Sequence, residues 1–368
     1  MKAALALPIL VAPARAAAED NEVGFTLLGY KERGLMKVSE PLVWARGRIA
    51  EVWEVEGSAA VDIVTGASPR LVSNAGGVPV QTVSGASIND RRETGDVKVT
   101  RRLGDFSLAA SGTLSKEEDY DSKAFGFEGT ADFNERNTTL IAGYGKSNDR
   151  VKSTDDPTLD APRYTTEYLA GVTQLLTPAS LVQSTVRWSK GDGYYDDPYK
   201  FTITFYPQGQ AALAADTRPD HRDTLSWLTR YRRHFPDAHG TLQADYRFYR
   251  DDWGIRAHTL EVAWQQDWGE AWSVRPSLRY YTQSAADFYS PVIPQPQPGI
   301  LSSDQRLGAF GGLSPALRVT RRFDNGLVIE GTLGYVQNAR NLHWGGNGSE
   351  AFDTLRAAYG IVGIHKAF

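Results

Sequence analysis

A set of eight charged side chains recurs at alternate positions of the segment 222–283, and these residues could act together chemically. They are five arginines and three carboxylates: Arg230, Arg232, Arg247, Arg275, Arg279, Asp245, Glu261 and Asp267. Guanidinium groups bind carboxylates through paired hydrogen bonds, and rings of arginine select anions in pores. The set therefore permits two interpretations: a ladder of cross-strand ion pairs that stiffens a wall, or an electropositive constriction that selects anionic solutes.

The other groups that could do chemistry form weaker patterns. The chain has no cysteine, which excludes disulfides, thiolate metal sites and cysteine nucleophiles. The segment 191–200 and the residues Asp155, Asp156 and Asp160 carry carboxylates that could bind Ca²⁺, but their spacing matches no ligand series. We expect a solvated aromatic loop and surface charge there, with no metal and no cofactor.

Histidine and serine give one arrangement to consider. His343, followed by Ser349, has a faint similarity to the pair of outer-membrane phospholipases, in which a histidine activates a serine hydroxyl. The spacing is wrong for that pair. The other histidines, His221, His234, His239, His258 and His365, suggest no dyad with an acid. We expect a protein that is not an enzyme, with a barrel hydrolase as a remote alternative.

Strands must position these side chains. Between Arg222 and Gln283 the chain repeats a run of about eleven residues that is apolar at every second position, closed by turns such as those at 235–238 and 268–270. A strand sends successive side chains to opposite faces, so each run has one apolar, aromatic-ended face and one charged face. Soluble sandwiches use strands of about five or six residues, whereas these lengths suit a tilted strand that crosses a bilayer. The pattern predicts an all-β fold, a transmembrane antiparallel β-barrel.

The same reading along the chain predicts sixteen strands. They are 22–31, 36–48, 54–65, 93–103, 106–118, 122–134, 137–147, 164–176, 179–190, 222–234, 239–251, 254–267, 271–283, 305–321, 326–338 and 352–368. An even number places both termini on the periplasmic side, beside short turns. The segments 66–92, 148–163, 191–221, 284–304 and 339–351 are then long extracellular loops. We expect the first of them, bracketed by the near-copies 65–69 and 84–87, to fold compactly and to tuck into the lumen.

The two ends of the chain indicate export. Lys2 precedes an apolar stretch and a series of small residues, which predicts a cleavable signal peptide over 1–18 and a mature barrel over 19–368. The terminal Phe368 is typical of the signal read by outer-membrane assembly machinery, although Lys366 departs from it. Without the signal the net charge is −6, and no nucleic-acid partner is expected. The expected location is the outer membrane of a Gram-negative bacterium, with outer-membrane lipid around the barrel.

Several longer strings carry a resemblance. The segments 132–140, 193–200, 231–235 and 245–254 are similar to the bacterial family called domain of unknown function 3570 (DUF3570), and the likeness covers nearly all of the mature chain. The resemblance implies an outer-membrane protein for which no solute or reaction is settled. Family members tend to be encoded near a small lipoprotein, a thioredoxin-like protein and a flavin-attaching enzyme, which implies an extracytoplasmic redox system.

Two functions follow as expectations. The first is a channel or porin-like protein with an arginine-rich lumen, because wide barrels hold water unless something plugs them. The second is a non-conducting scaffold that holds a periplasmic redox lipoprotein or cytochrome against the membrane, which rests on the family's genetic neighbours alone.

Overall fold

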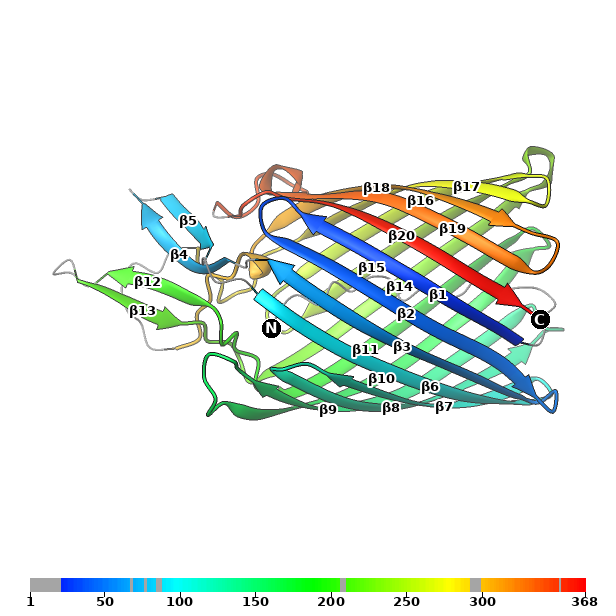
Figure 1. The fold of residues 1–368 in the computed structure, drawn as a ribbon, viewed down its shortest axis with the longest axis horizontal. Helices are drawn as coiled ribbons and strands as arrows, with labels where there is room; N and C mark the ends of the chain where they lie inside the picture. Colours follow the sequence, from blue (N-terminus) through cyan, green and yellow to red (C-terminus); the bar gives the residue numbers. More distant parts are fainter. Residues whose placement is uncertain are drawn as a thin grey trace.

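The computed structural model describes residues 21–66, 69–75, 78–83, 88–205, 210–291, 299–350 and 352–368. The predicted signal peptide, 1–18, lies outside them. Sixteen antiparallel strands close into one barrel (Figure 1). In barrel order they are β1 (Asn21–Glu32), β2 (Met36–Ile49), β3 (Trp53–Gly66), β6 (Ile88–Leu103), β7 (Phe106–Lys116), β8 (Tyr120–Phe133), β9 (Thr138–Lys152), β10 (Asp160–Thr177), β11 (Ser180–Gly193), β14 (His221–Phe235), β15 (Gly240–Asp251), β16 (Arg256–Trp268), β17 (Trp272–Gln283), β18 (Phe310–Arg322), β19 (Leu327–Ala339) and β20 (Leu355–Ala367). The predicted fold class is confirmed.

The barrel has two different rims. At one rim short turns join the strands, and positive φ angles at Gly104 and Gly326 let the chain reverse tightly there. The last residue also lies at this rim, where the Phe368 amide donates a hydrogen bond of 3.0 Å to the Asn21 carbonyl oxygen. This length is typical of backbone hydrogen bonds. We call it the short-turn rim, and the opposite end, which carries the long connections, the loop rim (Figure 1).

The alternating sequence produces an apolar outer face and a polar inner face on the barrel. Leu278 on β17 is 52% exposed and Phe127 on β8 is 58% exposed, whereas in a soluble protein such side chains would form a core. Their outward direction fits contact with lipid, where closed barrels satisfy every backbone group. Among the described residues the helices are 3₁₀ turns, and none is long and apolar enough to cross a membrane.

Leu278 gives a test of this outer face. Because it lies near the middle of β17, Leu278→Arg is expected to lower the free energy of unfolding in lipid by about 2–4 kcal/mol. The measurement is reversible refolding into phospholipid vesicles along a denaturant series, followed by tryptophan fluorescence. The control is Ser277→Arg, one residue away on the inner face. Equal losses for both variants would contradict a lipid-facing Leu278.

Several predicted boundaries were wrong. Strand β9 continues to Lys152 and β10 begins at Asp160, so the loop between them is 153–159 rather than the predicted 148–163. Strand β6 begins at Ile88 rather than at 93. Charged side chains in these extensions interrupt the apolar alternation, although the backbone ladder continues past the apolar zone. Conversely, β18 begins only at Phe310, after the 3₁₀ turn η2 (Gln305–Leu307), and β20 begins at Leu355 rather than at 352.

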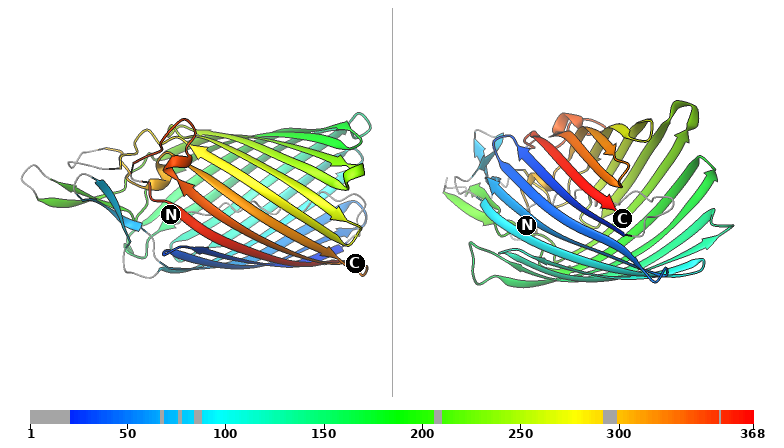
Figure 2. Two further views of the ribbon diagram at one scale, coloured as in Figure 1. Left: turned by 90° about the horizontal axis from the view of Figure 1, so that it is seen from above. Right: turned by 45° about the vertical axis from the view of Figure 1, so that its right-hand side comes forward.

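A second sheet stands outside the barrel. It consists of β4 (Pro69–Ala75), β5 (Val78–Val83), β12 (Phe201–Phe205) and β13 (Ala211–Ala215), in the order β13-β12-β4-β5. Figures 1 and 2 show it beyond the loop rim, at the end away from the C-terminus. The expectation that the first long loop tucks into the lumen is therefore wrong for β4 and β5. The near-copy at 84–87 lies outside the described residues.

Candidate functional site: the charged inner wall and its cap

One row of charged residues crosses four neighbouring strands of the inner wall. Arg230 on β14 is the register partner of Asp245 on β15, which pairs with Glu261 on β16, which pairs with Arg279 on β17. These residues alternate with Tyr231, Tyr246 and other outward side chains, as the sequence predicts. The row lies within the strands rather than in mobile loops, so the barrel scaffold positions its charges.

Part of this set is paired. Asp245 receives a two-pronged contact from Arg232, with Nη2 at 3.1 Å from Oδ2, and Arg230 Nε lies 3.7 Å from Oδ2. Glu261 lies 3.4 Å from Arg275, whose Nε also donates to the side chain of Gln243 over 3.1 Å. The ladder of ion pairs that the sequence permits is therefore present for Arg230, Arg232 and Arg275.

Arg247 and Arg279 are different. In the described part of the chain neither forms an ion pair with a carboxylate, although Glu261 is the register partner of Arg279. Arg247 faces Leu228 and Thr259 instead. Two further inward arginines escaped the sequence analysis: Arg318, which is opposite Arg275 and 3.6 Å from Glu330, and Arg187, 4.0 Å from Glu167. This side of the lumen thus carries excess positive charge.

Asp267 does not join the group. It lies next to the last residue of β16, at the short-turn rim, where its Oδ1 accepts a hydrogen bond of 3.0 Å from Gln265. Its register partner is Ser273 rather than an arginine. All eight predicted residues lie on β14–β17. Seven of them belong to the two ion-pair clusters or lie beside them, whereas Asp267 is at the short-turn rim, away from both clusters.

The opposite wall carries carboxylates. In the closed order of sixteen strands, β2 and β3 stand eight positions from β14 and β15. The inward positions of β1, β2 and β3 include these acidic residues: Glu22, Glu40, Glu54, Glu56 and Asp62. Some are paired, as in Arg46–Glu22 at 2.9 Å and Arg102–Glu54 at 2.7 Å. A basic wall that faces an acidic wall produces a field across the lumen, which orients and separates charged solutes.

A cap made of two loops covers the loop rim above the basic wall. The described parts of these loops, 194–205 with 210–220 and 284–291 with 299–309, join through backbone hydrogen bonds in both directions between Thr217 and Leu301, at 3.2 and 3.0 Å. An apolar cluster packs the second loop, through Ala286 and Leu307, against Trp253 and Ile255 of the β15–β16 turn. The inner wall holds the cap through Gln283, whose amide donates to the Gly308 carbonyl oxygen over 2.8 Å. Figure 2 shows these loops gathered at the end of the barrel.

A buried ionic network fastens the two loops. Asp304, whose side chain is 0% exposed, receives Arg306 Nε at 2.7 Å and Arg218 Nη2 at 3.0 Å. Arg306 also reaches Asp197 at 2.5 Å, and Arg218 reaches Asp216 at 2.5 Å. Burial alone would raise the pKa of Asp304, but Arg306, Lys200 and Arg218 hold that pKa well below its usual range.

The network corrects one expectation. The segment 191–200 was expected to be a solvated aromatic loop, but the side chain of Asp197 is 3% exposed and Tyr199 is buried as well. The reason is long-range: Arg306 is more than a hundred residues away and supplies the countercharge. By contrast, Asp155, Asp156 and Asp160 are exposed, as predicted.

Comparison with known sequences decides the family. The family described as "Protein of unknown function (DUF3570)" matches residues 1–161 and 156–356. The chain belongs to this family. Among curated proteins no sequence matches.

Solved structures place the DUF3570 chain among outer-membrane barrels. A bacterial polysaccharide outer membrane secretin matches with a TM-score of 0.50 and 10% identity, over 96% of this chain and 100% of the other. CdiB from Acinetobacter baumannii matches with a TM-score of 0.53 and 5% identity, over 95% of this chain and 61% of the other. The siderophore receptor PirA from Pseudomonas aeruginosa matches with a TM-score of 0.47 and 10% identity, over 95% of this chain and 62% of the other. At such identities the likeness concerns the fold.

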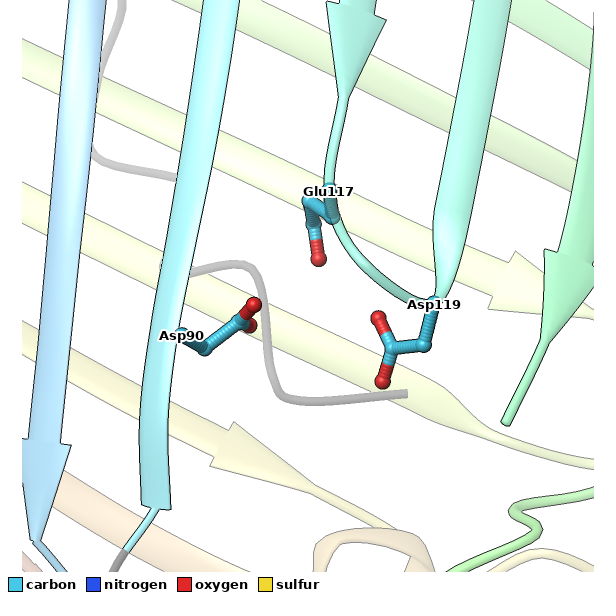
Figure 3. A group of neighbouring side chains, drawn as sticks. All are labelled: Asp90, Glu117 and Asp119. Atoms are coloured by element: carbon cyan, nitrogen blue, oxygen red, sulfur yellow. The ribbon is translucent and has the colours of Figure 1, made fainter. Parts of the chain in front are cut away.

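The enzyme-like arrangement of the DUF3570 chain does not assemble. The Ser349 hydroxyl accepts a hydrogen bond of 2.8 Å from the Ala309 amide, which fastens the loop 340–354 to the start of β18. In the described residues no contact joins Ser349 to His343. Three acidic side chains, Asp90, Glu117 and Asp119, lie close together at the loop rim (Figure 3). The Tyr199 hydroxyl donates to Asp119 over 2.6 Å, so this cluster helps to anchor the cap, and we assign no metal to it.

Proposed function

We propose that this protein is an outer-membrane channel that favours anionic solutes. The observation that carries the proposal is the pair Arg247 and Arg279, two inward guanidinium groups without a carboxylate partner in the described chain. Charged groups that line a narrow aqueous path raise the local concentration of the opposite charge. The paired arginines hold the wall rigid, while the unpaired arginines remain available to a passing anion.

The orientation and the cap extend this proposal. Single-chain bacterial barrels place both termini and the short turns in the periplasm, so the cap is extracellular. The Asp304 network joins the two loops of the cap to each other, Gln283 joins the cap to the wall, and we propose that the cap controls entry. Solutes that pass would reach the basic wall of β14–β17 on one side and the carboxylates of β1–β3 on the other.

Planar bilayer recording tests the proposal. The mature chain, purified in detergent, is inserted into a neutral bilayer between two KCl solutions of different concentration. We expect single-channel steps and a reversal potential of the sign produced by preferential chloride passage. A chain that inserts without conductance, or one that prefers potassium, would contradict the proposed function.

A further inference from the structure

Four cations without acidic partners gather on the outer wall at the loop rim. Lys31 on β1 and Lys37 on β2 are direct register partners. Arg33 follows in the turn between these strands, and its amide donates to the Arg356 carbonyl oxygen of β20 over 2.9 Å. All four side chains are exposed. Lys31 lies an even number of positions from Val23, Phe25 and Leu27 on β1, so it shares their outward face, and the lysine pair lies on the lipid side of the barrel.

Several other cations of the outer loop rim have carboxylate partners, although Arg250 and Arg256 form a second like-charged register pair without one in the described chain. Lys152 lies 2.6 Å from Asp121, Arg150 lies 2.9 Å from Asp160, and Lys190 lies 3.9 Å from Asp223. None of the four cations of the cluster around Lys31 has such a carboxylate in the described chain. Like charges directly opposite each other on one sheet face weaken strand pairing, so an anion from outside the chain would stabilise the lysine pair.

A groove begins beside this cluster and runs along the lipid-facing wall. Its volume is about 570 Å³, and it is lined by residues of β1, β2, β3, β19 and β20 that include Lys31, Lys37, Ile63 and Leu333. The polar end carries the two lysines. The apolar end includes Leu333, which is 73% exposed. A cationic entrance joined to an apolar groove is complementary to a lipid whose headgroup bears phosphate.

We propose that this face of the barrel binds a phosphorylated glycolipid of the outer leaflet. Its phosphates would lie on Lys31 and Lys37, with Arg33 and Arg356 beside them, and one acyl chain would occupy the groove along β1 and β20. The inference uses the orientation given under the proposed function, in which the loop rim is extracellular. It does not use the lumen, because the lysines and the groove are on the other face of the wall.

The test is lipid binding by the full mature chain, measured by native mass spectrometry after delipidation in detergent. The probe is lipid A that carries both of its phosphates. Because each basic residue near a lipid surface contributes about 1 kcal/mol, the double variant K31Q/K37Q is expected to weaken binding by about thirtyfold. The matched control K190Q removes a lysine that already has a carboxylate partner, and it should leave binding unchanged.

A second variant separates the groove from the headgroup. A side chain at Gly29 would meet no atom of the protein within 4 Å of its Cβ, so Gly29→Leu fills the groove without straining the wall. It should weaken lipid A and leave the binding of inorganic pyrophosphate unchanged. Equal binding by K31Q/K37Q and the wild type, or full competition by pyrophosphate alone, would overturn the lipid site. The anion preference of the channel should not change in either variant, so the two proposals fail separately.

Discussion

Reversal of the charge at Arg247 and Arg279 is expected to turn an anion-preferring channel into a cation-preferring channel. The double variant R247E/R279E replaces two positive charges on the inner wall by two negative charges. A unit charge at 4 Å contributes about 1 kcal/mol in water and more in a narrow path, so the preference should shift by at least about tenfold. In a KCl gradient the reversal potential should change sign.

This effect should be separable from misfolding. Neither arginine has an ion pair that the substitution would break, and both face the lumen rather than the lipid. The matched control is R250E/R256E, which makes the same change at two exposed, outward positions of β15 and β16. The control should keep the wild-type reversal potential. If R247E/R279E also kept it, the basic wall would not be the selective element.

The barrel could be predicted from the sequence because its determinants are local. In β15 the apolar residues Leu242, Tyr246 and Phe248 occupy alternate positions, and this period is visible in a single strand. The charged row on the inner wall follows from the same period. Which arginines are paired does not follow, because that depends on register: Asp245 meets both Arg230 and Arg232, while Arg247 lies two positions along and meets Leu228.

The cap could not be predicted in the same way. Asp197 and Arg306 are separated by 109 positions, and nothing in the local sequence of either loop indicates the other. Strands β4 and β12, which pair in parallel, belong to loops that enclose six strands of the wall between them, and only closure of the barrel brings the loops together. Long loops therefore carry the part of this fold that sequence periodicity leaves open.

Loss of the Asp304 charge is expected to release the cap while the barrel stays folded. In Asp304→Asn the buried guanidinium group of Arg218 and the partly exposed one of Arg306 lose a shared carboxylate. Removal of one partner from a buried ion pair costs about 3–5 kcal/mol, because the remaining charge is uncompensated. Hydrogen exchange should therefore quicken in 299–309 and in 210–220, but not in the strand ladders. Under the proposed function the conductance should rise as well.

The control is Asp156→Asn, an exposed carboxylate in the neighbouring loop 153–159 that is outside the network. It should leave both the exchange rates and the conductance unchanged. Unchanged exchange in Asp304→Asn would show that the apolar cluster around Trp253 holds the cap without the ionic network.

Acid should act on the same contact in a defined window. Burial favours a raised pKa for Asp304 in the folded protein, but the charge of Arg306 outweighs burial and depresses that pKa. The Asp304 carboxylate therefore stabilises the folded cap at pH values above its unfolded pKa of about 3.9. That stabilisation is lost only as the pH falls from there toward the lower folded pKa. In the wild type, the hydrogen-exchange protection of the cap, corrected for the intrinsic exchange rate, should therefore be the same at pH 7 and pH 5. In Asp304→Asn the further loss of protection in stronger acid should be absent. Opening already at pH 5 would contradict this assignment, and His221 could not account for it: its hydrogen bond to Asp220 raises the pKa of its imidazole, so protonation of His221 favours the folded state in acid.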